Sequence, residues 1–330
     1  MQEKLSQLLN KPIQKIDKLF GDASYRAYYR AFADSGETFV VMALPEGKMS
    51  ASEEITNLKT QPSEPSFINV QKYLKSAGLP VPKIVLFSPE NRWIVLEDLG
   101  DVKLWDVVTQ ASTDEIVSWY KKALDLLIQF QKLKPGNCIA FERSFDAPLL
   151  NWEFNHFWEF FIETREIEMK PGDKEIFETE TKKITAELCK LPTLLTHRDF
   201  QSRNLMIKND QLYLIDFQDA LIGTKIYDLV ALLRDSYINL TPHLKTLIHY
   251  YCEKSGENFE QTWNAFNLQT LQRKLKDTGR FVFIDRVKKN PSFLPYIPLS
   301  LNYIQQAFEE LPKYKTLHDM LNHYIPEWRL

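Results

Sequence analysis

A short segment of this chain carries two carboxylates and an amide at a spacing that suits phosphoryl-transfer chemistry. Asp199 is followed at a short distance by Asn204 and then by Asp216. A phosphoryl group in transfer spreads negative charge over its oxygens, so hard cations must stabilise it. Mg²⁺ prefers oxygen ligands, which Asp216 and the side-chain carbonyl of Asn204 can supply. Asp199 is then expected to accept a hydrogen bond from the attacking hydroxyl and to orient it.

The residues between these side chains predict a hairpin that brings them together. From Thr196 onward the chain reads THRDFQSRNLMIKNDQLYLIDFQD. An apolar strand, a polar turn at 208–210 and a second apolar strand would return Asp216 to the side of Asp199. The alternative is an ordinary polar hairpin between buried strands. The full pattern HRD-x₄-N-x₁₁-DF is long enough to favour the chemical interpretation.

Composition excludes several classes of protein. The chain has 330 residues, 44% hydrophobic and 26% charged, which predicts a globular protein large enough for two lobes around a cleft. Its net charge is −3 and it has no basic block, so neither a nucleic-acid partner nor a membrane surface is expected. The N-terminus lacks the apolar stretch of a signal peptide, and no apolar run approaches membrane-spanning length. We therefore expect a cytoplasmic protein, and no protein partner is indicated.

The cysteines and histidines indicate structural roles. Cys138, Cys189 and Cys252 are odd in number and far apart, so they are expected to be reduced and buried, with no disulfide framework or zinc site. We call residues 197–204 the catalytic segment. His197 and Phe217 are expected to hold its shape, and the other five histidines show no metal-ligand spacing.

The hydrophobic pattern predicts an α+β fold in two parts. A short helix at 1–10, three strands within 13–44, a helix at 67–77 and two further strands indicate a small antiparallel sheet with one helix. Residues 45–65 are rich in Pro, Ser, Glu and Lys and predict a loop. Beyond Gly100 the period is mostly helical. The clearest predicted helices are 116–133, 152–167, 174–188, 227–237 and 298–311.

With this organisation and the HRD…N…DF hairpin, the chain resembles the aminoglycoside phosphotransferase-like kinases, relatives of protein kinases that act on small molecules. The resemblance covers nearly the whole chain. It implies a bilobal protein-kinase-like fold, with a nucleotide-binding lobe at 1–98 and a mainly helical catalytic and substrate-binding lobe at 99–330. Several segments resemble, within that group, the N-acetylmuramate/N-acetylglucosamine anomeric kinases of cell-wall recycling: LEDLG, GDASYRAYYR, HRDFQSRNLM, LIDFQDA, YDLVALLRD and LQRKLKDTGRF.

Carried over residue by residue, the resemblance implies ATP and Mg²⁺ as cofactors and a small-molecule amino sugar as acceptor. Asp199 matches the catalytic base, while Asn204 and Asp216 match the metal ligands. Arg203 lies on the same loop, where it could meet a polar or anionic substrate group; a salt bridge within the lobe is an equally simple interpretation. Asp228 is expected to cap the N-terminus of the helix in YDLVALLRD.

The nucleotide side departs from the usual pattern in its phosphate loop. The residues that the resemblance assigns to nucleotide binding are Gly21, Ser24, Tyr25, Glu97 and Leu99. Glu97 and Leu99 belong to the linker whose backbone binds adenine, and the others belong to the loop over the phosphates. That loop has one glycine, so backbone N–H groups and the Ser24 hydroxyl have to hold the phosphates.

A second departure concerns the lysine–glutamate pair that contacts the phosphates in such kinases. Met42 stands at the lysine position and Phe67 near the glutamate position. Loss of one partner would leave a buried charge unpaired, whereas loss of both is coherent. Arg26, Arg30 or Lys48 could supply the missing positive charge, and the sequence does not choose among them.

The sequence says less about the residues that bind the acceptor substrate. Trp152, Phe154, Phe157 and Trp158 stand at helical spacing, which favours a core role, although one of them could line a sugar pocket. The preferred interpretation is phosphorylation of the anomeric hydroxyl of an amino sugar. The alternatives are another small-molecule kinase, of the aminoglycoside or choline type, and a non-catalytic nucleotide-binding pseudokinase. Few acidic clusters surround the catalytic segment, which weakens the aminoglycoside alternative because a polycation needs anionic walls.

Overall fold

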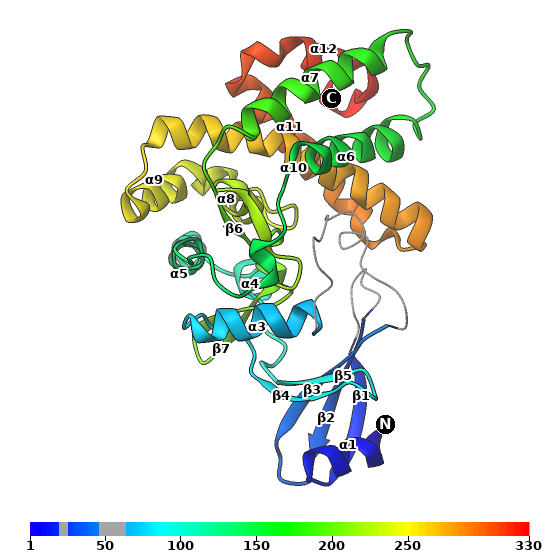
Figure 1. The fold of residues 1–330 in the computed structure, drawn as a ribbon. Helices are drawn as coiled ribbons and strands as arrows, with labels where there is room; N and C mark the ends of the chain where they lie inside the picture. Colours follow the sequence, from blue (N-terminus) through cyan, green and yellow to red (C-terminus); the bar gives the residue numbers. More distant parts are fainter. Residues whose placement is uncertain (20–25, 46–63, 330) are drawn as a thin grey trace.

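A five-stranded antiparallel sheet forms one end of the molecule and helices form the larger remainder (Figure 1). The computed structural model describes residues 1–19, 26–45 and 64–329, so the predicted loop at 45–65 lies almost entirely outside the described residues. The sheet has the order β1-β2-β3-β5-β4. Its strands are β1 (Ile13–Leu19), β2 (Ala27–Ala33), β3 (Thr38–Ala43), β4 (Ile84–Ser88) and β5 (Trp93–Glu97). The small antiparallel sheet predicted from the sequence is confirmed.

The two faces of this sheet bury different residues because neighbouring side chains on a strand point to opposite faces. On one face, Val41 and Val95 pack with Leu5 of helix α1 (Gln2–Leu9). On the other face, Met42 and Ile94 join the large core that continues into the helical part. Helix α3 (Ser66–Ser76) lies between the sheet and the helices (Figure 1). The sheet is therefore joined to the rest of the molecule by a continuous apolar core, while the predicted boundary after residue 98 stays a prediction.

The remainder of the chain is mainly helical, with four short strands around the catalytic segment. The helices are α4 (Leu104–Val108), α5 (Thr113–Gln131), α6 (Ala147–Phe157), α7 (Asp173–Leu188), α8 (Tyr227–Leu233), α9 (Leu244–Ser255), α10 (Phe259–Lys288), α11 (Ile297–Glu310) and α12 (Lys315–Tyr324). The strands are β6 (Thr193–Thr196), β7 (Leu205–Lys208), β8 (Gln211–Leu214) and β9 (Leu221–Thr224). Strands β6 and β9 pair with each other, as do β7 and β8.

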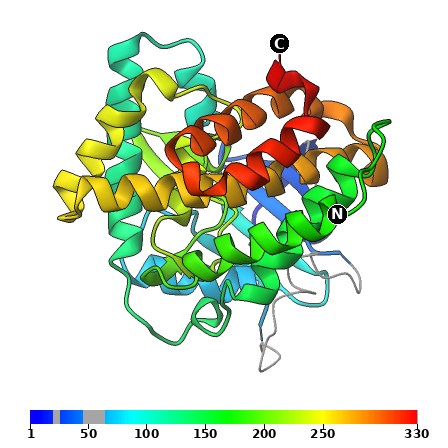
Figure 2. The same cartoon turned by 90° about the horizontal axis from the view of Figure 1, so that it is seen from above.

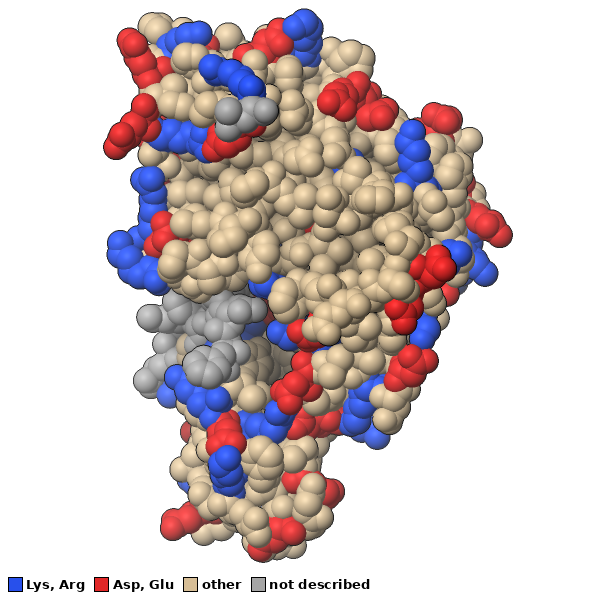
Figure 3. Space-filling model, turned by 180° about the vertical axis from the view of Figure 1, so that it is seen from behind, with Lys and Arg blue, Asp and Glu red and all other residues tan. Residues whose placement is uncertain are grey.

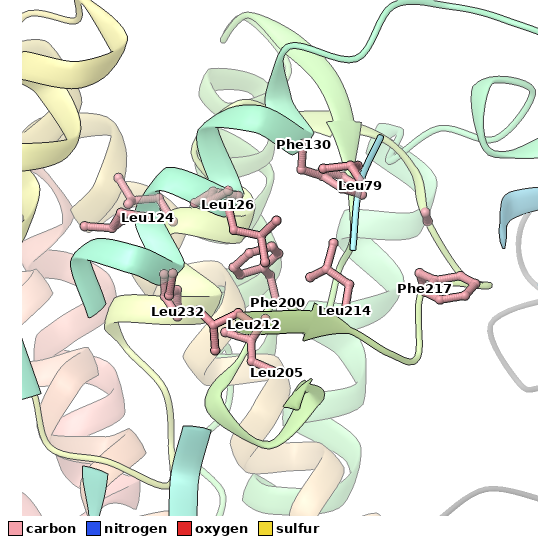
Figure 4. Packing of buried hydrophobic residues seen from close by; sticks show 14 of the residues in the cluster. Leu79, Leu124, Leu126, Phe130, Phe200, Leu205, Leu212, Leu214, Phe217 and Leu232 are labelled. Atoms are coloured by element: carbon pink, nitrogen blue, oxygen red, sulfur yellow. The ribbon is translucent and has the colours of Figure 1, made fainter. Parts of the chain in front are cut away.

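The predicted hairpin is present as β7 and β8. Lys208 pairs with Gln211, and the two residues between them, Asn209 and Asp210, have φ angles of 51° and 60°. Asn and Asp tolerate this left-handed conformation, which a two-residue hairpin turn requires. Its apolar side chains pack against α5 in one cluster (Figure 4). This cluster contains Phe200 and Phe217 together with Leu124, Leu126, Phe130, Leu205, Leu212 and Leu214.

The long helix α10 crosses the helical part and packs against α6, α8 and α11 (Figure 2). A Cβ atom added to Gly279 would lie 2.6 Å from the Cα of Phe157 and 2.8 Å from the carbonyl oxygen of His156. Only glycine therefore permits this close approach of α10 to α6. The same helix carries Arg273, which contacts Asp199 and the Arg198 carbonyl.

Three expectations differ from the structure in detail. The helix predicted at 227–237 ends at Leu233, because the Asp235 carboxylate accepts the backbone N–H of Tyr237 and competes with helix continuation. Helix α10 was not among the clearest predicted helices, because both polar and apolar residues are buried along it and its apolar stripe is weak. The expectation that all three cysteines are buried is wrong for Cys189, which is exposed.

The surface agrees with the balanced composition. On the face shown in Figure 3, the described Lys and Arg side chains are interspersed with Asp and Glu. Within residues 1–19, 26–45 and 64–329, the helices are too short or too polar to cross a lipid bilayer.

Candidate active site

The catalytic segment follows strand β6 and is held by the buried carboxylate of Asp228. The backbone N–H of His197 donates to one oxygen at 2.6 Å, and that of Arg198 donates to the other at 3.0 Å. The His197 ring contacts the Ile215 carbonyl at 3.0 Å, which links the start of the segment to the strand before Asp216. The shape-holding role expected of His197 agrees with these contacts. The expectation that Asp228 caps its own helix is wrong, because its carboxylate binds the catalytic segment instead.

A second buried carboxylate, that of Asp235, holds the far end of the same segment. It accepts the backbone N–H of Ser202 at 2.9 Å and the Ser202 hydroxyl at 2.5 Å. Both carboxylates belong to the YDLVALLRD segment, at the start and just beyond the end of α8. Burial raises the pKa of Asp228 to about 6, while His197 and the two N–H donors favour its ionised form. The backbone between residues 197 and 202 is thus fixed from one neighbouring helix.

Asp199 lies partly exposed on this segment and contacts a buried arginine. The Nη2 atom of Arg273, on α10, lies 3.3 Å from Oδ1 of Asp199, and its Nη1 donates to the Arg198 carbonyl at 2.6 Å. The Asp199 side chain is 42% exposed, whereas that of Arg273 is 2% exposed. Burial opposes ionisation of the Asp199 carboxyl, but the charges of Lys276, Arg273 and Arg198 outweigh it and lower its pKa. The carboxylate is therefore held in place, ionised and open to solvent on one side.

Arg273 was not singled out from the sequence as a site residue. The available signal was its place in LQRKLKDTGRF, a segment used only to support the family resemblance. Spacing cannot reveal this contact, because 74 residues separate Arg273 from Asp199. Glu153 of α6 was also missed: it is 1% exposed, lies 3.7 Å from Arg198 and accepts Gln272 at 2.7 Å.

The structure brings Asn204 and Asp216 to the same region as Asp199. The Asn204 amide donates to the Asp199 carbonyl at 2.9 Å, which fixes the orientation of the side chain and leaves its oxygen available as the predicted metal ligand. Asp216 adopts φ 62°, an uncommon conformation for a non-glycine residue, and accepts Gln218 at 2.8 Å. Burial and the neighbouring Asp199 raise the pKa of Asp216 to about 6. An oxygen donor set with excess negative charge fits Mg²⁺, because a divalent cation would relieve that repulsion.

The linker after β5, residues 97–99, is held by Lys208 and Arg30. Lys208 of the hairpin contacts the Glu97 carboxylate and the Asp98 carbonyl, each at 2.9 Å. Arg30 of β2 lies 2.7 Å from the Asp98 carboxylate and also pairs with Asp101. The backbone N–H of Glu97 already donates to the Lys83 carbonyl. Any adenine contact must therefore come from other backbone groups of the linker.

Arg26, Arg30 and Lys48 were the candidates from sequence for the positive charge that replaces the missing lysine, and the structure describes two of them. Arg30 is paired with the linker carboxylates, whereas Arg26 lies 4.0 Å from Oδ1 of Asp216. Lys48 and the predicted phosphate-loop residues Gly21, Ser24 and Tyr25 lie outside the described residues. Leu99, the other predicted linker residue, is buried at 6% exposure.

The positions of the missing ion pair are filled by apolar packing. Met42 is fully buried, Phe67 is 6% exposed, and both belong to the same core. The Phe67 ring stacks on that of Phe217 with centroids 4.8 Å apart. An apolar contact thus links α3 to the residue after Asp216, in agreement with the expectation that both charges were lost together.

Met42→Lys should destabilise the protein by about 3–5 kcal/mol, because it places an unpaired charge in this core. The double variant Met42→Lys/Phe67→Glu should recover part of that loss by pairing the charges. Urea unfolding measures both, and Met169→Lys at an exposed position is the matched control, expected to change stability by less than about 0.5 kcal/mol. Wild-type stability in Met42→Lys would contradict the apolar packing.

Arg203 is surrounded by aromatic side chains. Its guanidinium lies 3.8 Å from the ring centroid of Tyr237 and 4.9 Å from those of Trp105 and Tyr296. It also donates to the Tyr296 hydroxyl at 2.5 Å. These contacts tie the catalytic segment to α4 and to the chain before α11. The substrate contact expected of Arg203 stays a prediction.

The aromatic segment of α6 is mainly core, as its spacing favoured. Phe154 and Phe157 are fully buried and Trp158 is 2% exposed. Trp152 differs: it is 39% exposed and stacks on the ring of His156 at a centroid distance of 5.2 Å. Of the four aromatic residues considered from sequence, Trp152 alone offers a face to solvent.

Comparison with known proteins gives a matching family model and curated relatives. Residues 16–264 match the family model described as "Phosphotransferase enzyme family". Two curated relatives are each called N-acetylmuramate/N-acetylglucosamine kinase. The one from Pseudomonas aeruginosa is 28% identical, over 91% of this chain and 86% of the relative. The one from Neisseria meningitidis is 27% identical, over 94% of this chain and 91% of the relative.

Solved structures show the same fold at low identity. The choline kinase LicA from Streptococcus pneumoniae has a TM-score of 0.62 at 17% identity, covering 95% of this chain and 98% of that one. The ADP-bound aminoglycoside phosphotransferase APH(2'')-Ib has a TM-score of 0.62 at 15% identity, covering 93% and 97%. The bilobal fold expected from the sequence is thereby confirmed.

Proposed function

Because the chain belongs to the phosphotransferase enzyme family, we propose that it transfers the γ-phosphate of ATP to the anomeric hydroxyl of an amino sugar. The acceptor class is that named for the curated relatives, N-acetylglucosamine or N-acetylmuramate. The observation that carries the proposal is the convergence of Asp199, Asn204 and Asp216 on a rigidly held segment. The cytoplasmic location stays a prediction.

Asp199 is proposed to orient the acceptor hydroxyl for attack. Its carboxylate is partly exposed, so it can accept a hydrogen bond from a bound alcohol, and Arg273 fixes its position from the other side. The cations that lower its pKa also make it a weak base. A weak base suits an anomeric hydroxyl, which is more acidic than an ordinary sugar alcohol. Positioning then matters more than proton removal.

Asp216 and Asn204 are proposed to hold Mg²⁺ against the phosphates of ATP. When bound, the metal supplies the positive charge that neutralises the phosphate oxygens. Arg26 is proposed to add a second positive charge in place of the missing lysine, because of the three candidates it is the one that the described structure shows beside Asp216. Glu97 and Leu99 are proposed to lie beside adenine, and Gly21, Ser24 and Tyr25 beside the phosphates.

We expect ATP-dependent turnover of N-acetylglucosamine or N-acetylmuramate to give a sugar 1-phosphate. Phosphorus NMR would identify this product by the coupling of its phosphorus to the anomeric proton. Release of phosphate in mild acid would confirm that the product is a sugar 1-phosphate. The 1-deoxy analogues should bind without reacting, since they lack the acceptor oxygen. A 6-phosphate product, or turnover of a 1-deoxy sugar, would contradict the anomeric assignment and leave the kinase assignment intact.

The same assay separates the alternatives. ATP consumption with choline or an aminoglycoside, and none with amino sugars, would indicate a different acceptor. Nucleotide binding without turnover of any of these compounds would indicate a pseudokinase. The cations around Asp199 disfavour a polycationic acceptor, because Lys276, Arg273 and Arg198 would repel it.

A further inference from the structure

One face of α10 extends a row of charged side chains away from Asp199. Arg273, Lys276, Asp277 and Arg280 stand at helical spacing on this face. Arg273 contacts Asp199 directly. Since a helix rises about 1.5 Å per residue, Lys276 stands about 4.5 Å and Arg280 about 10 Å farther along the axis than Arg273. The first of these steps is within the width of one sugar ring.

Three neighbouring cations of α10 contact the same carboxylate. The single carboxylate of Asp277 lies 3.7 Å from Nε of Arg273, 2.6 Å from Nζ of Lys274 and 3.2 Å from Nζ of Lys276. The Glu153 carboxylate of α6 is nearby but contacts Gln272 and lies 3.7 Å from Arg198. Arg273 has Asp199 as a second carboxylate contact. Lys276 instead contacts the Asp277 carboxylate that two other cations also contact, so an additional anion would be attracted to Lys276.

Of the three cations that contact Asp277, Lys276 is the one with access to solvent. Its side chain is 17% exposed, compared with 2% for Arg273 and 1% for Lys274. Burial opposes its charge, but Tyr227, Asp277 and Glu153 together raise its pKa above the ordinary lysine value. Lys276 thus stays protonated and can still reach a ligand.

An aromatic wall adjoins the cations. The His156 ring lies 5.2 Å from those of both Trp152 and Phe283, and Arg280 lies 4.7 Å above the Phe283 ring. Burial together with Arg280 and Lys276 lowers the pKa of His156 to about 3, so its imidazole is neutral. Trp152 stacks on the His156 ring that these cations influence, and its exposed surface could accept a sugar ring that carries an anionic substituent.

We propose that Lys276, assisted by Arg280, binds a carboxylate substituent of the acceptor sugar while the reacting hydroxyl lies at Asp199. The proposal rests on the amino-sugar kinase function proposed above. It assigns the preference between two acceptors: N-acetylmuramate carries a carboxylate on an ether substituent and N-acetylglucosamine does not. A charge-assisted hydrogen bond from Lys276 would favour the first.

The test compares both sugars in wild type, Lys276→Met and Lys276→Arg. Lys276 also influences Asp199, so its removal will affect both sugars, and the informative quantity is the ratio of their kcat/KM values. We expect Lys276→Met to lower the ratio of N-acetylmuramate to N-acetylglucosamine by about 10-fold or more, mainly through KM. Lys276→Arg should keep the ratio within about 3-fold of wild type, since the charge is retained.

A second measurement does not depend on how the variants fold. In the wild type, the KM for N-acetylmuramate should rise with ionic strength while that for N-acetylglucosamine stays nearly constant. An unchanged ratio in a folded Lys276→Met variant, or equal salt dependence of the two sugars, would overturn the carboxylate site and leave the proposed function standing. Wild-type turnover of N-acetylglucosamine alone would also overturn the site. Turnover of neither sugar would instead contradict the proposed function.

Discussion

Asp199→Asn should lower kcat by at least about 10²-fold while ATP binding survives, because it removes the negative charge proposed to orient the acceptor hydroxyl. Asparagine keeps the size of the side chain. The carbonyl contact of Arg273 with Arg198 and the Asp228 contacts with the backbone are unaffected by the change, so the segment should keep its shape. Steady-state kinetics give kcat, and calorimetric titration with a non-hydrolysable ATP analogue gives the nucleotide affinity.

Asp210→Asn is the matched control for this substitution. Asp210 lies at the tip of the same hairpin, its side chain is 76% exposed, and it pairs with Lys122 at the surface. The same chemical change there should leave kcat within about 2-fold of wild type, since surface ion pairs contribute little. If Asp199→Asn turned over at nearly the wild-type rate, the assignment of the catalytic segment would be wrong.

Asp216→Ala should lower Mg²⁺-dependent turnover by at least about 10²-fold, because it removes the one charged side chain proposed to hold the metal. Asn204→Ala should have a smaller effect, since a neutral amide contributes less charge to the cation. The Asn204 side chain also donates to the Asp199 carbonyl, so its loss should loosen the segment as well.

Titration of activity with Mg²⁺ distinguishes these effects. Asp216→Ala should need far more Mg²⁺ or lose activity at every concentration, whereas Asn204→Ala should regain part of its activity as Mg²⁺ rises. Asp210→Asn again serves as the control and should show the wild-type Mg²⁺ requirement. Wild-type Mg²⁺ dependence in Asp216→Ala would refute its role as a metal ligand.

The proximity of Asn204 to Asp216 could be predicted from sequence because it depends on pairing between strands that are close together in the chain. The segment from His197 to Phe217 contains its own strands and turn, and pairing of Leu205 with Leu214 brings Asn204 close to Asp216 without help from distant residues. The five strands of the sheet and helix α3 could be predicted for the same reason, since apolar alternation and turn residues act over a few positions.

The sequence also predicted that the lysine–glutamate pair is replaced by two apolar residues, Met42 and Phe67. Both residue types are apolar at positions where the family resemblance implied charges, and two apolar residues can bury each other without a counter-ion. The structure adds the third member of this contact, Phe217, which only the tertiary packing of α3 could supply.

Only the tertiary structure decided which charged groups meet. Arg273 reaches Asp199 across 74 residues and Asp228 reaches His197 across 31. The residue type of Arg30 suits a phosphate contact equally well, yet in the folded chain it pairs with Asp98. In each case the residue type permits several partners, and spacing along the chain does not rank them.

The physical reason is the range over which each kind of information acts. Hydrogen bonding and alternation within a hairpin depend on neighbouring residues, so they can be read from the sequence. The pairing of buried charges depends on where helices cross. Here the close approach at Gly279 brings α10 against α6, and Arg273 of the same helix contacts Asp199. Desolvation makes those buried pairings selective, yet no local pattern encodes them.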